Sequence, residues 1–286
     1  MPRTVNRKPP WIKFKIPGGH NYRNVKRVIE EQDLHIVCVE AVCPNIGECL
    51  NSGTATFLIL GNVCTRNCRY CAVTKGVPGT LDTGEPARVA EAVCVLGLKY
   101  AVVTSVTRDD LADGGAGIFA QTVSLIRGRT PVCGIELLIP DFRQSMNESL
   151  DMIIASGPDV INHNIEVVNR YYHTLRPKGD YDISLSVLEH VAASGIPAKS
   201  GLMIGFGESI RDIRNTLLDL YSAGCRYITI GQYCKSTVSG HPVDRYYHPD
   251  EFAEIGQMAE EIGFTGVMSG PMVRSSYNAH SMIKHP

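Results

Sequence analysis

The sequence lacks the features that mark the extreme classes of protein. It has one Trp, no low-complexity tract or linker that divides the chain, and no apolar run near the ~20 residues that span a bilayer. No short apolar stretch follows the first basic residues as in a secretory signal. A formal net charge of -1 gives no overall attraction to nucleic acid or to a membrane. For 286 residues we expect a globular, cytoplasmic protein of two ordinary domains or one large α/β barrel.

The even charge balance conceals an uneven distribution. Residues 1–29 carry eight of the 28 basic residues and no acidic one, which leaves 20 basic against 29 acidic residues in the remainder. The eight are Arg3, Arg7, Lys8, Lys13, Lys15, Arg23, Lys26 and Arg27. This basic arm contains no Ser, and Pro9, Pro10 and Pro17 break a long helix, which disfavours an organellar transit peptide. We expect a solvated arm or a docking surface for an acidic partner.

Cysteines are abundant and unevenly placed. Six of the ten fall within 34 residues, at Cys38, Cys43, Cys49, Cys64, Cys68 and Cys71. A secreted disulfide scaffold would be short and would spread its cysteines, whereas a cluster in a cytosolic chain more often binds metal. The other four, Cys94, Cys133, Cys225 and Cys234, stand singly in apolar or strand-like segments. We predict that these four are small buried hydrophobic residues.

Strand-like and helix-like segments alternate after the cysteine region. The predicted strands are 55–61, 100–106, 135–140, 159–165, 198–205 and 227–232, with 264–269 as a seventh. The predicted helices are 86–98, 117–127, 146–156, 184–193, 210–223 and 249–262. Strands rich in Val, Ile and Leu, each followed by a helix, indicate a parallel sheet built from βα units. The number of units favours a complete or partial (β/α) barrel, although a doubly wound sheet stays open.

Polar and unusual residues follow the predicted strands. These stretches are 64–71, 104–110, 140–143, 162–166, 205–208 and 231–233. In a (β/α) barrel the functional groups gather at the C-terminal ends of the strands. We therefore expect these stretches to line one mouth of the barrel.

The stretch Cys64-Thr-Arg-Asn-Cys68-Arg-Tyr-Cys71 follows the first predicted strand. Three thiolates in one loop can hold three irons of a 4Fe-4S cube and leave the fourth iron without a protein ligand. Electron-transfer clusters are normally closed by a fourth Cys, whereas an open iron accepts a substrate or a cofactor. A zinc site is the alternative, but it would need four N or S ligands, and no matching pair lies nearby.

A second motif, Cys38-x4-Cys43-x5-Cys49, again supplies three thiolates and falls one ligand short of a closed cluster. A further ligand must come from elsewhere in the chain. A structural zinc knuckle is the alternative for this motif taken alone.

The first motif, with Tyr70 before its last Cys, resembles the signature of the radical S-adenosylmethionine (SAM) superfamily. With the second motif, the chain resembles the lipoyl synthase family over nearly its whole length. The stretches that carry this resemblance are 8–17, 43–49, 53–57, 104–111, 113–115, 138–142, 162–166, 199–203, 205–208, 231–233 and 269–277.

The resemblance implies an α/β fold of a defined kind, a partial (β/α)6-type TIM barrel with extensions at both ends. It divides the chain into an N-terminal extension with the auxiliary-cluster cysteines (1–52), a radical SAM barrel (53–270) and a C-terminal tail (271–286). It also implies a sulfurtransferase activity. Two sulfur atoms are inserted at carbons 6 and 8 of a protein-bound octanoyl-lysine to form the lipoyl group, with the auxiliary cluster as sulfur donor.

The same resemblance assigns site residues. Cys64, Cys68 and Cys71 would hold the SAM-binding 4Fe-4S cluster, and Cys38, Cys43, Cys49 and Ser276 an auxiliary 4Fe-4S cluster, with Ser275 as the alternate serine. Residues expected at SAM or the substrate are Thr104, Ser105, Asn162, Asn164, Glu166, Lys199 and Arg176. No acid or base catalyst is expected. The serine pair could instead be a turn or an N-cap, and His163 is expected to be a core residue that points to the helix layer.

The cofactors implied are two 4Fe-4S clusters and two molecules of SAM per turnover. The partners implied are an octanoylated lipoyl carrier domain or H protein as substrate and a reductant such as ferredoxin or flavodoxin. No binding to nucleic acid or to a membrane is expected, and the protein is expected to be a monomer. The sequence departs from the family pattern at Leu50, Thr107 and 234–236, where Cys-Lys-Ser replaces the usual Leu, polar residue and Pro. Two rival hypotheses are a related sulfur-inserting enzyme for another substrate and a non-catalytic iron or zinc protein.

Overall fold

The computed structural model describes residues 8–13, 17–51 and 55–282. These residues form an eight-stranded sheet in the order β1-β2-β5-β6-β7-β8-β9-β10. The strands that run parallel are β2 (Thr56–Ile59), β5 (Tyr100–Ser105), β6 (Gly134–Leu138), β7 (Val160–Asn162), β8 (Ala198–Ile204), β9 (Tyr227–Gln232) and β10 (Gly266–Gly270). Strand β1 (His35–Ile36) is antiparallel to β2 at one edge.

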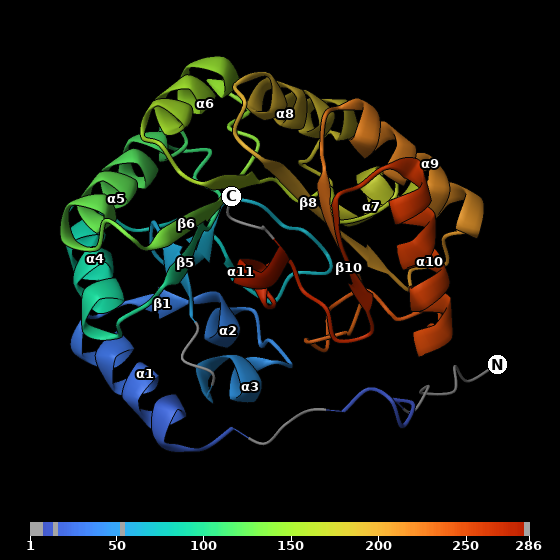
Figure 1. The fold of residues 1–286 in the computed structure, drawn as a ribbon, viewed down its shortest axis with the longest axis horizontal. Helices are drawn as coiled ribbons and strands as arrows, with labels where there is room; N and C mark the ends of the chain where they lie inside the picture. The colour runs from blue at the N-terminus through green and yellow to red at the C-terminus, as the bar shows by residue number, and fades with distance from the viewer. Residues whose placement is uncertain (1–7, 14–16, 52–54, 283–286) are drawn as a thin grey trace.

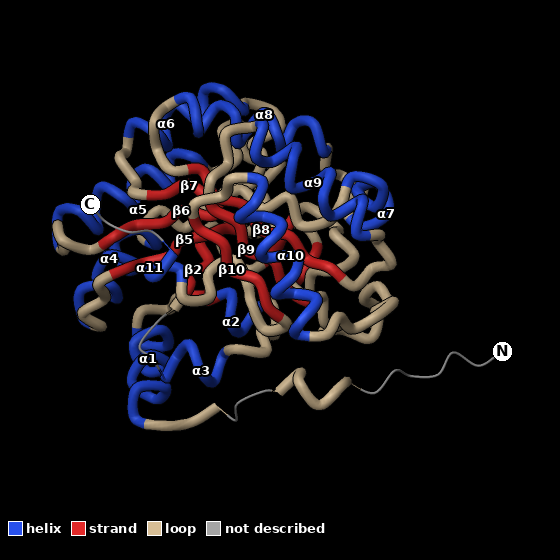
Figure 2. The backbone as a smooth tube through the Cα atoms, turned by 45° about the vertical axis from the view of Figure 1, so that its right-hand side comes forward, coloured by secondary structure: helices blue, strands red, loops and turns tan. Residues whose placement is uncertain are grey.

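Helices cover the outside of this sheet. They are α4 (Glu85–Val95), α5 (Ala116–Arg129), α6 (Met146–Ala155), α8 (Tyr181–Ala193), α9 (Ile210–Ser222) and α10 (Pro249–Ile262). Figure 1 shows them as an outer arc around the strands, and Figure 2 shows the strands at the centre of the molecule. In the described part of the chain β1 and β10 do not pair, so the barrel is partial. The predicted α/β barrel fold is confirmed, including the seventh strand.

Each predicted helix is present, and the observed ends follow from local capping. Helix α8 begins three residues before the predicted start because the Asp180 side chain accepts hydrogen bonds from the backbone N–H groups of Asp182 and Ile183. Helix α9 begins where predicted, and its first turn carries a capping box between Ser209 and Asp212.

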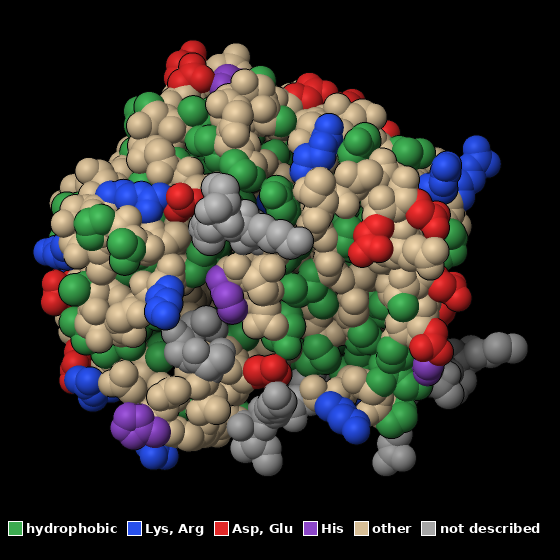
Figure 3. All heavy atoms as spheres, viewed as in Figure 1, with side chains coloured by type: hydrophobic (Ala, Val, Ile, Leu, Met, Phe, Trp, Pro, Cys, Tyr) green, Lys and Arg blue, Asp and Glu red, His purple; other side chains and the backbone are tan. Residues whose placement is uncertain are grey.

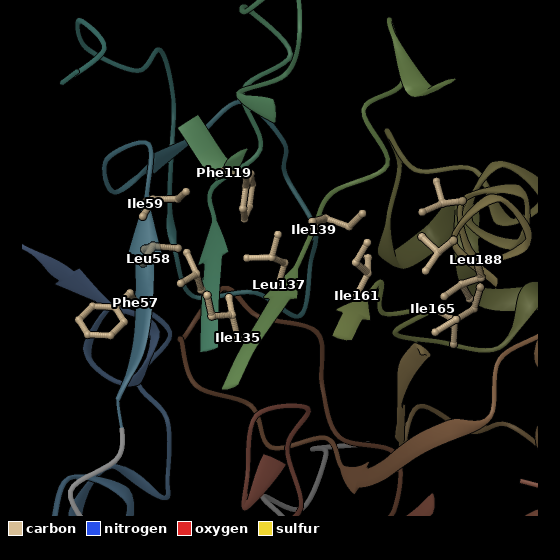
Figure 4. Close-up of a cluster of buried hydrophobic side chains, with 14 of the residues drawn as sticks. Phe57, Leu58, Ile59, Phe119, Ile135, Leu137, Ile139, Ile161, Ile165 and Leu188 are labelled. Carbon is tan, nitrogen blue, oxygen red and sulfur yellow. The ribbon is translucent and has the colours of Figure 1, made fainter. Parts of the chain in front are cut away.

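The core lies between the strands and the outer helices. Phe57 and Ile59 on β2 and Ile135 and Leu137 on β6 are fully buried, and Figure 4 shows them beside Phe119 of α5. Apolar residues occur on both faces of these strands because barrel interior and helices bury both faces of a parallel sheet. This packing fixes the strand ends where the polar stretches emerge.

The basic arm is not a uniform solvated segment. Its second half forms α1 (His20–Glu31), whose apolar residues Val25, Val28 and Ile29 are buried. On the outer face Lys26 pairs with Glu30 at 3.5 Å and Arg27 with Glu31 at 2.7 Å. These pairs reduce the local excess of positive charge. Arg3, Arg7 and Lys15 lie outside the described residues.

The first half of the arm is anchored at one point. The Trp11 indole N–H donates a hydrogen bond to the Tyr247 carbonyl at 3.1 Å, and the ring packs edge-on against His248 with centroids 4.8 Å apart. His248 is the N-cap of α10, so the arm crosses the start of that helix. Tyr247 and His248 therefore hold this part of the arm against the barrel.

The remaining elements are short. They are α2 (Val37–Glu40), α3 (Ile46–Asn51), β3 (Val63–Cys64), β4 (Thr74–Lys75), η1 (Asn169–Tyr171), α7 (Tyr172–Leu175) and α11 (Ala279–Met282). None of the helices in the described ranges is long and apolar enough to cross a membrane. Charged side chains of both signs are scattered around the rim of the face in Figure 3 rather than gathered in one patch.

Candidate functional site

Cys64 is the last residue of β3, and Cys68 and Cys71 lie in the loop between β3 and β4. The two strands pair in parallel and so bring the two ends of this cysteine loop together. Arg66 within the loop is 5% exposed. Its guanidinium donates to Asp141 at 2.6 and 2.5 Å on one side and to Asp109 at 2.8 and 3.0 Å on the other. These carboxylates follow β6 and β5, so Arg66 fastens the cysteine loop to two strand ends.

Backbone contacts fix the loop further. The Thr65 hydroxyl donates to the Thr107 carbonyl at 3.0 Å, and Lys178 donates to the Thr65 carbonyl at 2.8 Å. The Arg69 N–H donates to the Leu175 carbonyl at 2.8 Å. The loop is thus held from three sides before any ligand binds.

A first cavity of about 170 Å³ lies over this loop. It is lined by Cys64, Cys68 and Cys71 together with five residues expected at SAM or the substrate: Thr104, Ser105, Asn164, Glu166 and Arg176. These five come from the ends of β5 and β7 and from the segment after α7. The structure therefore brings them together with the first cysteine triad.

Several buried polar atoms of this cavity have no hydrogen-bond partner among the described residues. They are Ser105 Oγ, His163 Nε2, Asn164 Oδ1 and Arg176 Nε. Leaving a buried polar atom unpaired costs about 1–3 kcal/mol, so such atoms are normally satisfied. Their concentration beside the cysteines fits a site that receives a polar ligand.

Asn164 and Glu166 connect the first cavity to the C-terminal tail. The Asn164 side-chain amide donates to Glu166 Oε1 and to Ser275 Oγ, each at 3.1 Å. Glu166 has a positive φ of 68°, a conformation that is strained for a non-glycine residue. Burial raises the pKa of Glu166, while the positive charge of Arg176 and the hydrogen bond from Asn164 act in the opposite direction.

A second cavity of about 270 Å³ adjoins the first. It is lined by the other cysteine triad, Cys38, Cys43 and Cys49, and by Ser275 and Ser276. The two cavities share wall residues, among them Leu58, Cys71, Thr104, Ser105, Asn164 and Glu166. The two cysteine motifs thus face adjoining spaces at one mouth of the barrel.

The tail reaches the second cavity through specific contacts. The Asn45 amide donates to the Met272 carbonyl at 2.6 Å, and the Tyr277 hydroxyl donates to Glu48 at 3.0 Å. Both partners lie within or beside the Cys43–Cys49 turn. A side chain at Gly231 would meet the Val273 carbonyl at 2.1 Å, so only glycine at the end of β9 allows this approach.

The two serines of the tail have different surroundings. Ser275 Oγ accepts the hydrogen bond from Asn164. Ser276 lines the second cavity and also a smaller neighbouring one together with Cys38 and Cys49. Ser276 is therefore the serine on the side of the cysteine triad.

Burial raises the pKa of two thiols in each triad, Cys38 and Cys43 in one and Cys68 and Cys71 in the other. Burial, followed by the charges of Cys43 and Cys49, raises the pKa of Cys38 to about 12. Burial, opposed by a hydrogen bond and reinforced by Cys68 and Glu166, raises the pKa of Cys71 to about 12. Bound iron would reverse this because a coordinating thiol is deprotonated.

Two residues expected at the cofactor lie elsewhere. Lys199 is fully buried and donates to Glu136 at 2.8 and 3.1 Å, and Asn162 donates to the same carboxylate at 3.2 Å. Tyr100 adds a third donor at 2.9 Å. Neither Lys199 nor Asn162 lines the two cavities. Glu136 forms an ion pair with Lys199 and accepts a hydrogen bond from the Asn162 amide, while Asn162 Oδ1 has no partner among the described residues.

The remaining predictions from the sequence have mixed outcomes. His163 is buried as expected, but its ring also borders the first cavity, and its Nδ1 lies 2.9 Å from the Ile139 carbonyl. Cys133 and Cys225 are buried as predicted. The prediction is wrong for Cys94, which is exposed on α4, and for Cys234, which is half-buried and lines the second cavity.

Comparison with known proteins identifies the family. The model of the radical SAM superfamily matches residues 58–220, and that of the N-terminal domain of lipoyl synthase matches residues 3–43. The lipoyl synthase of Roseiflexus sp. (strain RS-1) is 50% identical over 98% of this chain and 93% of its own length. The chain belongs to the lipoyl synthase family. The lipoyl synthase of Methylococcus capsulatus is 48% identical over 97% of this chain and 87% of its own length.

Solved structures support the fold of this lipoyl synthase family member. The FeFe-hydrogenase maturase HydG from Carboxydothermus hydrogenoformans has a TM-score of 0.60 at 15% identity, over 86% of this chain and 56% of that one. SuiB from Streptococcus suis, bound to S-adenosylmethionine, has a TM-score of 0.55 at 8% identity, over 76% and 51%. The chain thus spans little more than half of either structure, and at such identities the likeness concerns the fold alone.

Sequence reasoning missed the residues that hold the lipoyl synthase site together. Arg66 and Asp141 stood inside quoted motifs, yet nothing local indicated that they pair. The contact of Asn45 with Met272 joins positions 227 residues apart, and that of Glu48 with Tyr277 joins positions 229 residues apart. Their only sequence signal was their position inside two family motifs.

Proposed function

We propose that this lipoyl synthase inserts two sulfur atoms, at carbons 6 and 8 of a protein-bound octanoyl-lysine, and that its auxiliary cluster is the sulfur donor. One observation carries the proposal. The two cysteine triads face cavities that share a wall, so a chain positioned at one triad is adjacent to the other.

The radical SAM family implies a 4Fe-4S cluster and SAM, and the first cavity fits both. Cys64, Cys68 and Cys71 would hold three irons and leave one iron for SAM. The unpartnered atoms of Ser105, Asn164 and Arg176 are available to polar groups of SAM. When bound, this cofactor pair supplies a 5′-deoxyadenosyl radical that removes hydrogen from an unactivated carbon.

Five of the seven residues expected at SAM or the substrate remain in this proposal: Thr104, Ser105, Asn164, Glu166 and Arg176. Arg176 is 8% exposed, lies over the Tyr172 ring and donates to the Asn164 carbonyl at 3.2 Å. This fixed cation is suited to a carboxylate. Lys199 and Asn162 have a structural role at Glu136 instead.

The second cavity fits an auxiliary 4Fe-4S cluster on Cys38, Cys43 and Cys49. Ser276 is the proposed fourth ligand and Ser275 the alternate. In the described ranges no group of three His, Cys, Asp or Glu side chains is placed to hold a single metal ion.

Apolar residues line the space between the two triads. Leu58, Val73 and Leu138 border both cavities, and Met203 borders the second. Such a wall suits an alkyl chain, because burial of each CH₂ contributes about 0.8 kcal/mol. The same residues exclude water, which protects a carbon radical from side reactions.

The proposed division of the chain follows the same geometry. The barrel (53–270) carries the first triad, while the N-terminal extension (1–52) and the tail (271–286) build the auxiliary site from both ends of the chain. The hydrogen bonds Asn45–Met272 and Tyr277–Glu48 support this pairing. The boundary between residues 52 and 53 lies outside the described residues.

Membership of the family implies a lipoyl carrier protein as substrate. We propose more specifically an octanoylated lipoyl domain or H protein, a reductant such as ferredoxin or flavodoxin, two SAM per lipoyl group, and a monomeric enzyme in the cytoplasm.

The test is anaerobic turnover of the reconstituted protein with SAM, reductant and an octanoyl-lysine peptide. We expect the peptide to gain the mass of two sulfur atoms, and the Cys68→Ala variant to form neither 5′-deoxyadenosine nor product. The Cys43→Ala variant should still form 5′-deoxyadenosine but add no sulfur. Sulfur addition by Cys43→Ala at the wild-type rate would exclude the auxiliary cluster as donor.

A further inference from the structure

The second cavity contains a cysteine that belongs to neither triad. Cys234 lines it together with Cys38, Cys43 and Cys49 and with the tail serines. Cys234 is also one of the positions at which the sequence departs from the family pattern, where Leu is usual. The cavity therefore presents one thiol beyond the auxiliary triad and Cys71, the cysteine that it shares with the first cavity.

Cys234 and Arg274 line the same cavity as Cys43. A thiolate at Cys234 would therefore share this space with the triad and with a cation.

The backbone before Cys234 is rigid. The Gln232 amide donates to the carbonyls of Ile204, Tyr233 and Arg245 at 3.2, 3.0 and 3.1 Å. The Tyr233 ring stacks on Phe206 with centroids 4.3 Å apart, and its hydroxyl donates to the His241 carbonyl at 2.8 Å. Cys234 is therefore delivered to the cavity from a fixed point at the end of β9.

The tail serines arrive at the same place. Val273 packs on Gly231, three residues before Cys234, and Ser276 follows three residues after Val273. The cavity also contains Ser105 Oγ and Asn164 Oδ1, which are buried without partners among the described residues. Both residues also line the first cavity, so these unpaired atoms lie in the wall that the two cavities share.

A thiolate is the softer and more readily formed of the two possible ligands. Soft thiolates are preferred by iron–sulfur clusters over oxygen ligands, and a thiol that coordinates a metal is deprotonated on binding. A serine oxygen gives a weaker bond, which suits an iron that is released during sulfur donation.

We propose that Cys234 is a second ligand for the fourth iron of the auxiliary cluster and exchanges there with Ser276. The inference rests on the proposed function because it requires a cluster on Cys38, Cys43 and Cys49. In the exchange an Fe–O bond breaks and an Fe–S bond forms, the Cys234 proton passes to the serine oxygen, and no electron is transferred. The thiolate-bound form protects the sulfur store between turnovers, and the serine-bound form gives it up.

The first experiment measures which thiols the cluster protects. The reconstituted protein and its metal-free form are treated anaerobically with iodoacetamide, and alkylation of each cysteine is read by peptide mass. We expect Cys234 to be alkylated in the metal-free form and protected in the reconstituted form. Cys94, exposed on α4, is the internal control and should react in both. Equal reaction of Cys234 in both forms would overturn the proposal.

The second experiment separates ligation from steric cover. Loss of auxiliary iron to a chelator, without SAM, is timed for a Ser275→Ala/Ser276→Ala variant with and without Cys234→Ala. Because Cys234 holds the iron when both serines are gone, adding Cys234→Ala should speed the loss by about tenfold or more. Adding Cys94→Ala is the matched control and should change nothing. Equal rates with and without Cys234→Ala would overturn the proposal.

The iron and sulfide content of the starting protein distinguishes failure of this inference from failure of the proposed function. If the wild type holds a cluster that Cys43→Ala loses, but Cys234 is alkylated equally in both forms and adding Cys234→Ala does not speed the loss of iron, the inference alone is wrong. If Cys43→Ala retains the full iron content of the wild type, the auxiliary cluster itself is wrongly placed.

Discussion

At the scale of single residues, Arg66 determines how the first cysteine triad is presented. Its side chain is 4% exposed and lies between the fully buried Asp141 and the partly exposed Asp109. Planar, two-sided recognition of carboxylates is particular to Arg. The cysteine loop is therefore positioned by an ion-pair network rather than by apolar packing.

Replacing Arg66 by Gln leaves the Asp141 carboxylate buried without its cation, so we expect a loss of about 3–5 kcal/mol in stability and weaker loading of the first cluster. The Arg66→Lys variant should recover part of the stability but not the two-sided geometry. Arg69→Gln is the matched control, because Arg69 is an exposed residue of the same loop. Thermal unfolding and iron content are the measurements, and equal effects of the two Gln variants would contradict this account.

His163 gives the protein a pH dependence of stability. Burial, reinforced by the charge of Arg176 and opposed by Asp141 and the Ile139 carbonyl, lowers the pKa of His163 to about 4. An unfolded His has a pKa of about 6.5 and so gains its proton before the folded one does. Stability contributed by the neutral ring is therefore complete above about pH 6.5 and is lost as the pH falls toward 4.

The expected loss is on the order of 3 kcal/mol over that range. When the pH is lowered from about 7 to about 5, the denaturant concentration at the unfolding midpoint should decrease for the wild type and should decrease less for His163→Gln. Identical pH slopes for the two proteins would show that His163 does not titrate as described.

At the scale of elements, the tail and the end of β9 form one unit. Gly231→Ala would bring its Cβ to 2.1 Å from the Val273 carbonyl and displace the segment that carries Ser276. We expect iron to be lost from the auxiliary cluster while SAM binding to the first cluster remains. Gly128→Ala is the control, because nothing lies within 4 Å of its Cβ. Full auxiliary iron in Gly231→Ala would contradict the role of this contact.

The strands β6, β7 and β8 share a buried polar cluster of Glu136, Asn162 and Lys199 that does not line the two cavities. Because Lys199 neutralises Glu136 there, Lys199→Met should destabilise the protein by about 3–5 kcal/mol. A double variant that also replaces Glu136 by Leu should recover much of this loss, since no unpaired charge remains. The dissociation constant for SAM should be unchanged in both variants. A weaker affinity of the double variant for SAM would show that Lys199 contributes to SAM binding.

Elements with strong local signals could be predicted from the sequence. Apolar strands, each followed by a helix that ends at Gly, predicted the barrel. Helix α10 (Pro249–Ile262) has the predicted bounds because Pro249 begins it and Gly263 ends it. Helix α1 was missed because it follows a basic segment that contains several prolines. Its apolar face, Val25, Val28 and Ile29, is buried only in the folded protein.

At the scale of the whole molecule, the fold places two cysteine motifs from separate segments at one mouth. Each triad was predictable as a motif because its three cysteines lie close together in the sequence. The link between them was not, because it depends on long-range contacts such as Asn45–Met272 and Asn164–Ser275. Lys199 was expected at the cofactor from the resemblance, and its ion pair with Glu136 was not predictable because the two residues lie 63 positions apart on separate strands.

The central claim is that sulfur passes from the second cavity to an alkyl chain activated in the first. The most direct measurement reconstitutes the protein with heavy-isotope sulfide, removes free sulfide, and analyses the mass of an octanoyl-lysine carrier peptide after a single turnover. This account predicts a product with two heavy sulfur atoms and a matching loss of sulfide from the protein. Product that contains unlabelled sulfur, or that forms while the labelled sulfide stays on the protein, would contradict it.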